Sequence, residues 1–406
     1  MNGLYPHPKT KKYDEEIMTE LKKPLDPLFE PFTFVNGITL RNRIVMAPMT
    51  TWSSNSDETI SNEELAYYHA RAQGAGLVLT GCTHVQKSGI GFTGEFAAYD
   101  DCFIPSLRKL ADTAKSGGAS VVLQIFHAGN KAVPGLIPNA ELVSASAMAA
   151  PRGPFNDGKQ ASRALTHEEI LTVIRDFGEA TRRAIVAGFD GVELHGAHGF
   201  LIQNFLSPLF NQRTDEWGGS LEKRMRFPLE VVREVRRVIV AHAKRPFLLG
   251  YRISPEEPGE GGLRIHDALA LVDMLVDEGR IDYLHASLYN VLKGKPQDDA
   301  SGQSTAEQFI QRVGGRLPLV AAGEMRKPQD ARAAMALGLP LVAVGRGLVM
   351  NAHWVEKARA GRDSEIETAL DLSARATDLI VPSTLWAVIK GTPGWFPVRE
   401  PVAEPV

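Results

Sequence analysis

The stretch that decides the fold reads GVELHGAHGF and spans residues 191–200. It begins with a short apolar run and continues directly into two histidines, His195 and His198, three positions apart. A short run that is apolar at nearly every position is typical of a strand buried on both faces, as in a parallel sheet. A single histidine after such a strand is most often only solvated or hydrogen bonded. The meaning of the pair therefore depends on the rest of the chain.

Seven further short apolar runs alternate with longer helical patterns, which is typical of repeated βα units. The predicted strands cover residues 43–48, 76–81, 121–126, 191–195, 247–253, 282–287, 317–322 and 340–345. The predicted helices cover residues 62–73, 105–116, 167–187, 221–243, 265–279, 304–314, 328–337 and 347–360. Eight such pairs predict an α/β fold of the closed (β/α)8 TIM-barrel type.

A barrel of this type needs only about 250 residues, whereas the chain has 406, so we expect insertions and extensions. We divide the chain into an N-terminal arm (1–27), the barrel (28–361) and a C-terminal helix and tail (362–406). An insertion rich in Pro, Gly and Ala follows the third strand over residues 129–164. Its position over the barrel mouth suits a lid, although a plain surface loop stays open as an alternative.

Composition excludes several classes of function. A formal net charge of −3 and a pI near 6.4 give no electrostatic basis for binding nucleic acid. Cys82 and Cys102, the two cysteines, are too few for a disulfide framework or an iron–sulfur cluster and suit a reducing cytoplasm. The sequence has no apolar segment of signal-peptide or membrane-span length. We expect an unprocessed cytoplasmic protein that acts on a small molecule.

Polar residues at the carboxyl ends of barrel strands are the first candidates for chemistry, because active sites of this fold lie there. Side chains alternate along a strand, so Glu193 and His195 should face the barrel axis while Val192 and Leu194 face the helices. Gly196 and Ala197 then permit a turn that brings His198 beside His195. Two converging imidazoles suit an oxygen on which negative charge develops.

A metal site is the rival interpretation of the paired histidines. Zinc or iron would need a third ligand, and Glu193 is the near candidate. Glu193 lies deeper in the predicted barrel, where we expect it to pair with Arg252. We therefore predict no metal.

Glycines at the ends of the last two predicted strands suit a phosphate site. Gly323 and Gly345 stand where barrels often bind phosphate through backbone N–H groups, and Arg346 could add a charged contact. A Gly-Arg pair after a strand is also common in ordinary surface turns, so that alternative stays open.

Together these motifs resemble the Old Yellow Enzyme family of FMN-dependent oxidoreductases. The most specific stretch is HGAHGFLIQNFLSPLFNQRTDEWGGSLEKRMRF (195–227). Supporting stretches are RNRIVMAPMT (41–50), LQIFHAG (123–129), GYRIS (250–254) and AVGRGL (343–348). The resemblance implies a bound FMN and a transient NADH or NADPH donor. It also implies the stand-alone type of relative, because the cysteines for an iron–sulfur cluster and the length for a second dinucleotide-binding domain are missing.

The resemblance also implies which residues bind FMN. They are Ala47, Pro48, Met49, Thr50, Gly81, Cys82, Gln124, Arg252, Gly323, Gly345 and Arg346. Those of the first strand would line the isoalloxazine, with the Thr50 hydroxyl near O4. Gly81 or Cys82 would contact the pyrimidine edge together with Gln124, and Arg252 would lie by N1 and O2. The last three residues of the set would hold the phosphate.

The same resemblance implies that His195 and His198 bind a carbonyl or nitro oxygen of the substrate, and that Trp52 contacts the substrate. Phe200 would lie in the substrate site too, but many relatives have a proton-donating tyrosine there, and phenylalanine has no proton to give. A second departure is Asn130-Lys131, which stands where relatives have an arginine after HAG.

Three functions follow as hypotheses. The first is NAD(P)H-dependent reduction of the C=C bond of α,β-unsaturated carbonyl or nitro compounds. The second keeps the flavin but acts on nitro compounds or nitrate esters, or as a dehydrogenase, because of Phe200. The third, from another class, is a flavin-binding barrel with little turnover. The PGWFP segment (393–397) could pack on the barrel or reach a neighbouring subunit, which leaves a homo-oligomer open.

Overall fold

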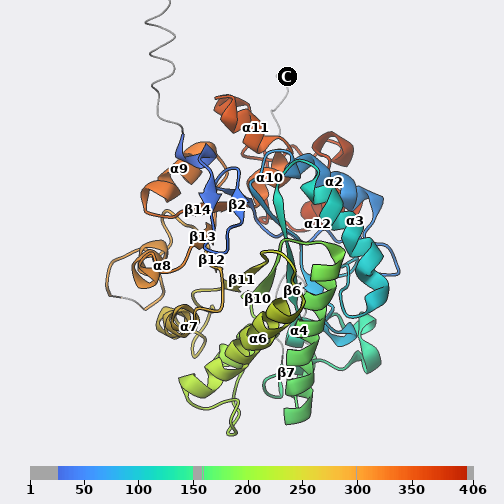
Figure 1. Ribbon diagram of the computed structural model, residues 1–406, viewed down its shortest axis with the longest axis vertical. Coiled ribbons are helices and arrows are strands. Elements are labelled where there is room, and N and C mark those ends of the chain that lie inside the picture. The colour runs from blue at the N-terminus through green and yellow to red at the C-terminus, as the bar shows by residue number, and fades with distance from the viewer. Residues whose placement is uncertain (1–25, 150–157, 159, 299, 400–406) are drawn as a thin grey trace, which may run out of the picture.

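A computed structural model describes residues 26–149, 158, 160–298 and 300–399. Within these residues, eight parallel strands form a closed barrel surrounded by helices (Figure 1). Each strand pairs with the next along the chain, and β14 pairs with β3 to close the ring. This confirms the predicted (β/α)8 barrel. The strands are β3 (Ile44–Met46), β4 (Leu77–Leu79), β6 (Ser120–Phe126), β10 (Gly191–Gly196), β11 (Leu248–Ile253), β12 (Tyr283–Ser287), β13 (Leu319–Ala322) and β14 (Leu341–Val344).

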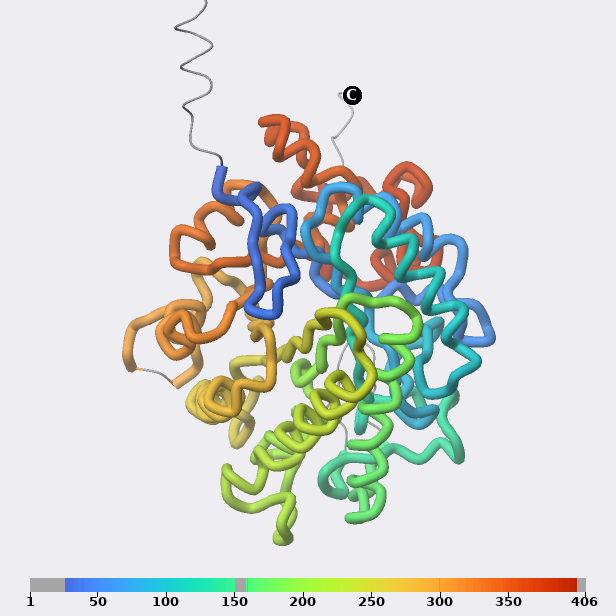
Figure 2. The backbone as a smooth tube through the Cα atoms, viewed as in Figure 1, coloured from blue at the N-terminus to red at the C-terminus, as the bar shows by residue number. Residues whose placement is uncertain are grey.

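The outer helices lie close to the predicted ranges, and the chain runs around the barrel in sequence order (Figure 2). Capping boxes begin several of them, including Ser61 with Glu64 at α2 and Thr166 with Glu169 at α4. These hydrogen bonds satisfy backbone N–H groups that would otherwise lack a partner, which fixes where each helix starts. The helices are α2 (Asn62–Ala72), α3 (Ile104–Lys115), α4 (His167–Ala187), α6 (Leu221–His242), α7 (Ile265–Glu278), α8 (Thr305–Val313) and α9 (Pro328–Ala336).

The prediction of one helix over residues 347–360 is wrong. Two short helices, α10 (Arg346–Met350) and α11 (Trp354–Arg359), occupy this range. Asn351 adopts an extended backbone between them, and its side-chain amide donates to the carbonyl of Glu367. That contact to a distant segment of the chain is not visible in the local sequence pattern.

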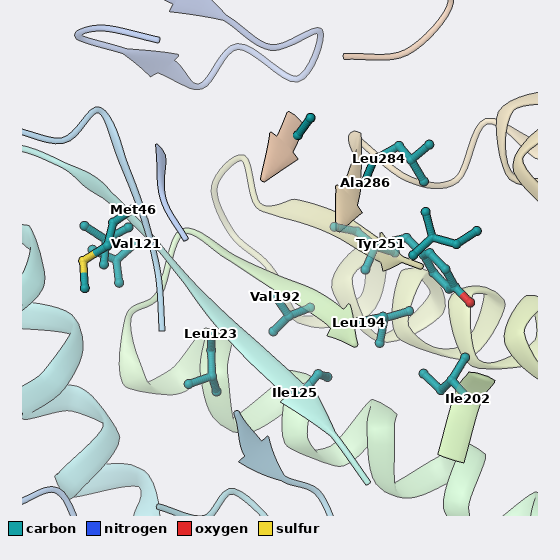
Figure 3. Packing of buried hydrophobic residues seen from close by; sticks show 14 of the residues in the cluster. Met46, Val121, Leu123, Ile125, Val192, Leu194, Ile202, Tyr251, Leu284 and Ala286 are labelled. Atoms are coloured by element: carbon teal, nitrogen blue, oxygen red, sulfur yellow. The ribbon is translucent and has the colours of Figure 1, made fainter. Parts of the chain in front are cut away.

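The two faces of the strands divide as their alternation predicts. Val192 and Leu194 of β10 pack in the large apolar cluster (Figure 3). The same cluster contains Val173 and Phe177 of α4. The intervening Glu193 and its neighbour His195 point into the barrel, as their contacts across it show below. The strand therefore presents an apolar face to the helices and a polar face to the axis.

A hairpin closes the amino end of the barrel. It consists of β1 (Phe32–Thr33) and β2 (Thr39–Leu40), which pair antiparallel. Phe34 is 2% exposed and its ring centroid lies 6.0 Å from that of Tyr283. These side chains share a cluster with the first residues of several strands, so the barrel interior is filled at this end.

The insertion after β6 contains a small three-stranded sheet of β7 (Val143–Ser144), β8 (Met148–Ala149) and β9 (Ala161–Ala164). Residues 150–157 and 159 of the predicted lid lie outside the described residues, as do residues 1–25 of the predicted arm. The helix α5 (Leu201–Leu206) follows the histidine turn, and α12 (Ser383–Gly391) lies in the C-terminal segment. The domain boundaries and the lid role stay predictions.

Candidate active site

The two histidines of the opening stretch lie side by side at the carboxyl end of β10. His195 is 1% exposed, whereas His198 follows the strand in a turn and is exposed. Their ring centroids are 5.0 Å apart and the rings meet at 74°. His198 adopts a φ of 60°, a left-handed conformation that is uncommon for a residue with a side chain. The backbone N–H group of His198 donates to the Ser254 hydroxyl at 3.0 Å, which helps to hold the turn.

The surroundings of His195 determine where its proton lies. The Ala197 N–H group donates to Nδ1 of His195 at 3.3 Å. Burial, together with the nearby His198 and Arg252, lowers the pKa of His195 well below its usual value, so the ring is neutral at pH 7. A neutral imidazole that accepts at Nδ1 carries its proton on Nε2. His195 is therefore a hydrogen-bond donor through Nε2.

Ser287 connects His198 to a buried arginine. Its hydroxyl lies 2.8 Å from Nε2 of His198 and accepts from Nη2 of Arg252 at 3.0 Å. Sequence reasoning missed Ser287, although it ends the predicted strand DYLHAS (282–287) and so stands at the carboxyl end of the barrel. The Ser287 hydroxyl, which accepts from Arg252, can donate its own proton to His198.

The predicted pairing of Glu193 with Arg252 is wrong. Glu193 accepts from Nε2 of Gln124 at 2.7 Å and lies 3.0 Å from Nδ1 of His285. Arg252 is in register with His195 rather than with Glu193, and Gly250 opposite Glu193 has no side chain to block the way to β12. Burial favours the neutral form of Glu193, but His285, the positive charge of Arg252 and the hydrogen bond from Gln124 together outweigh it and lower the pKa. Glu193 is thus a buried carboxylate that orients two neighbours.

Gln124 is engaged by its neighbours, whereas Arg252 keeps one unpartnered N–H group. The Cys82 thiol donates to Oε1 of Gln124 at 3.5 Å, and burial raises the pKa of that thiol, which stays protonated. The Gln124 amide is therefore fixed between Cys82 and Glu193. Nε of Arg252 is buried and has no hydrogen-bond partner among the described residues. A buried N–H group without a partner is costly unless a ligand accepts from it.

The ends of β3, β4 and β14 come close together. Ala47 and Pro48 are buried, while Met49 and Thr50 are partly exposed. A Cβ atom at Gly81 would lie 2.7 Å from the Met49 carbonyl oxygen, and one at Gly345 would lie 3.6 Å from the Met49 sulfur. Glycine is thus required at position 81 for this approach, and the Gly81 N–H group already donates to the Tyr68 hydroxyl at 2.8 Å. The structure brings these predicted residues to one rim of the mouth.

The predicted phosphate residues lie together at the ends of β13 and β14. Gly323 has a φ of 155°, and a Cβ atom there would lie 2.5 Å from the Leu288 carbonyl oxygen. Gly345 precedes α10, whose first turn has no side-chain cap. Arg346 pairs with Glu324 and donates through Nη1 to the Trp395 carbonyl at 2.7 Å, so part of its guanidinium is already engaged. Its direct contact with a phosphate stays a prediction.

Aromatic side chains surround the rim. Trp52 has a left-handed φ of 51°, and its ring centroid lies 5.2 Å from that of Phe92 and 5.6 Å from that of Trp395. The PGWFP segment therefore packs against the barrel of its own chain. Phe200 is 6% exposed, and its ring centroid lies 4.9 Å from that of His195 with the rings at 89°.

These residues fit an FMN. An unpartnered Nε of Arg252 suits an acceptor on the pyrimidine edge. At the other end, the bare backbone of Gly323 and the uncapped first turn of α10 suit a phosphate. Among the described residues, no group of three or more His, Cys, Asp or Glu side chains could hold a metal ion.

Comparison with known proteins points the same way. The model of the NADH:flavin oxidoreductase / NADH oxidase family matches residues 27–365. The chain belongs to this family. A probable NADH-dependent flavin oxidoreductase of Bacillus subtilis, YqiG, is 46% identical over 378 residues, which cover 92% of this chain and 98% of that protein. This flavin oxidoreductase therefore uses the predicted cofactors of its family, FMN and a reduced nicotinamide.

Solved structures place the barrel within the Old Yellow Enzyme group. The old yellow enzyme homologue from Zymomonas mobilis matches with a TM-score of 0.70 and 28% identity, over 82% of this chain and 92% of that one. Morphinone reductase in complex with tetrahydroNAD matches with a TM-score of 0.73 and 26% identity, over 95% and 100% of the two chains. Within the described part of this flavin oxidoreductase, no helix is long and apolar enough to cross a bilayer.

Proposed function

We propose that this flavin oxidoreductase takes hydride from NADH or NADPH and reduces the C=C bond of α,β-unsaturated carbonyl or nitro compounds. The observation that carries the proposal is the pair of imidazoles at the carboxyl end of β10, 5.0 Å apart, one of which has a defined donor atom. Two N–H donors directed at one oxygen stabilise the negative charge that develops there when hydride adds to the conjugated carbon. Bound FMN supplies that hydride.

Each residue of the pair has a defined task in this proposal. His195 donates from Nε2 and stays neutral, because burial lowers its pKa. Ser287 orients His198. When the Ser287 hydroxyl donates to Nε2 of His198, the ring's own proton lies on Nδ1, from which it would be donated to the substrate. Arg252 fixes Ser287, and its unpartnered Nε would donate to the pyrimidine edge of FMN. Trp52 and Phe200 provide apolar walls for the substrate.

Anaerobic stopped-flow measurements test this function. NADH or NADPH should bleach the yellow holoenzyme, and 2-cyclohexenone should restore the colour while cyclohexanone forms. His195→Ala should slow the second step by about 100-fold or more, as expected for the loss of a donor at a developing oxyanion. His242→Ala, at an exposed position at the end of α6, is the matched control. A holoenzyme that is bleached but then forms no cyclohexanone would contradict the proposal.

Phe200 favours a second function, because the site lacks a tyrosine hydroxyl there. Without a proton donor to the α-carbon, nitro compounds or nitrate esters could be the better electron acceptors. The same experiment separates the two, with 2-nitrophenol and glycerol trinitrate as further acceptors. Faster reoxidation by these compounds than by 2-cyclohexenone would support the second function. Absence of bleaching by either nicotinamide would instead support a flavin-binding barrel with little turnover.

A further inference from the structure

Lys131 lies at the histidine turn although no part of the proposed reaction uses it. It lies in the stretch HAGNKA (127–132), which follows β6. Its Nζ donates to the carbonyl of His198 at 2.6 Å and lies 5.8 Å from the centroid of the Phe200 ring. The next residue of the turn, Gly199, is close as well, because a Cβ atom there would lie 2.7 Å from Nζ. The ammonium therefore lies between the two proposed substrate-contacting residues.

This ammonium has no acidic partner within salt-bridge distance in the part of the chain that the structure describes. Glu257 is the acid whose charge affects it, but that carboxylate is occupied by other donors. It accepts from Gln203 at 2.8 Å, from Ser207 at 2.5 Å and from the Leu263 N–H group at 3.0 Å. An ammonium has three N–H donors, and the His198 carbonyl uses one of them.

The charges that act on His198 at this turn include those of Arg252 and Lys131, and the Glu257 carboxylate offsets part of the charge on Lys131. Burial lowers the pKa of Lys131, which reflects the cost of keeping a cation there. Glu193, the buried carboxylate of the barrel interior, is bound by Gln124 and His285 and does not neutralise Lys131. A partly buried cation without a salt-bridge partner is stabilised by an anionic ligand. The geometry of the turn thus suits a substrate with a negative group a few atoms away from the oxygen held by the histidines.

We propose that Lys131 is a specificity-determining residue that binds a carboxylate on the alkene substrate. The inference rests on the proposed function and names a substrate class within it, namely unsaturated carbonyl compounds that also carry a carboxylate. Free ammonium N–H groups of Lys131 would donate to the carboxylate while His195 and His198 bind the carbonyl oxygen. The nicotinamide donor also has anionic phosphates, so the test must separate the two half-reactions.

A matched pair of substrates tests this directly. trans-4-Oxo-2-pentenoate and its methyl ester share one carbon skeleton and differ in charge; because the ester is intrinsically the more reactive alkene, each variant is compared with the wild type on the same substrate. In the wild-type holoenzyme we expect the acid to reoxidise the flavin with the lower apparent Kd. Lys131→Met should lower the second-order rate constant for the acid by about 10- to 100-fold, the effect of one hydrogen bond to a charged group. It should change the rate with the ester less than about twofold, and Lys131→Arg should restore part of the preference.

Controls make each outcome decisive. Lys109→Met, at an exposed position on α3, should leave both rates unchanged. Equal losses for acid and ester in Lys131→Met would overturn the proposal, because Lys131 would then act on every substrate. A loss confined to flavin reduction by NADH or NADPH would overturn it as well and assign Lys131 to the donor phosphates. If the wild-type enzyme reduces 2-cyclohexenone but neither the acid nor the ester, this inference fails while the proposed function stands. If it reduces none of the three compounds, the proposed function itself fails.

Discussion

Phe200 is the residue at which the site differs most from an enzyme that carries its own proton donor. Its ring lies edge-on to His195 and within 5.8 Å of the Lys131 ammonium, in a small apolar cluster with Phe126 and Cys82. Hydride addition to an alkene requires a proton at the neighbouring carbon, and phenylalanine cannot supply it.

Phe200→Tyr should therefore speed the reoxidation of reduced enzyme by 2-cyclohexenone by about 10-fold or more, the lower part of the range for general acid catalysis. A solvent deuterium isotope effect on this step should change with the substitution. Flavin reduction by NADH needs no such proton and serves as the internal control. An unchanged reoxidation rate would show that water or another group already protonates the substrate efficiently.

His84 is a second residue with a measurable consequence. It ends β5 (Thr83–His84), is fully buried, and lies 2.7 Å from Glu95 and 3.4 Å from Glu58. Burial alone would lower the pKa of His84, but its hydrogen bond with Glu95 and the nearby Glu58 carboxylate outweigh burial and raise the pKa to about 9. The unfolded chain has the ordinary histidine pKa of about 6.5.

Because the folded pKa of His84 is higher than its unfolded pKa, the protonated imidazole contributes its full stability below about pH 6.5, and this contribution is lost as the pH rises through about 9. We expect the free energy of unfolding to fall by about 1–3 kcal/mol over this interval. Urea unfolding at pH 6.5 and pH 9.5 measures the difference, and His84→Gln should reduce it. The same fall in both proteins would show that other groups cause it.

At the scale of elements, the strands and most helices could be predicted because their patterns are local. The run GVELH (191–195) shows its burial in its own residues, and the Ser61 and Thr166 capping boxes mark helix starts. The break at Asn351 could not be predicted, because it depends on a contact with Glu367. The partners of Glu193 could not be predicted either, since they depend on the register between strands of the closed barrel.

The connection after β13 gives a prediction at this scale. Gly323 combines a φ of 155° with a backbone carbonyl 2.5 Å from any added Cβ atom. Gly323→Ala should destabilise the fold by about 1–3 kcal/mol through backbone strain and weaken FMN binding. Flavin fluorescence titration and thermal unfolding measure the two effects. Gly135→Ala, where no atom lies within 4 Å of the added Cβ, should change neither. Wild-type FMN affinity in Gly323→Ala would remove this glycine from the phosphate site.

For the whole molecule, Arg71 connects the barrel to the C-terminal segment. This fully buried side chain on α2 donates to the carbonyls of Leu348 and Val349 at 2.9 and 3.2 Å. It also donates to the carbonyls of Ile380 and Leu379 at 2.9 and 3.1 Å. One guanidinium thus satisfies backbone groups of two segments that are far apart in the sequence, and it holds the segment that carries Trp395 on the barrel.

Arg71→Met keeps the apolar part of the side chain but leaves several buried carbonyls without a donor. We expect the free energy of unfolding to fall by about 3 kcal/mol or more and limited proteolysis to cut first in the segment after α11. Arg175→Met, at an exposed position on α4, should have no effect on either measurement. A variant that resists the protease as the wild type does would show that Trp395 and Arg346 hold the segment without Arg71.

The hairpin that carries Phe34 has a kinetic consequence. Because the amino end of the barrel is filled, small molecules can approach the barrel axis from the carboxyl end alone. The nicotinamide and the substrate that accepts the hydride must therefore bind in turn at the same site. Double-reciprocal plots of the initial rate against the concentration of one reactant, at several fixed concentrations of the other, should then be parallel. An excess of either reactant should inhibit turnover, because it occupies the enzyme form that the other one needs.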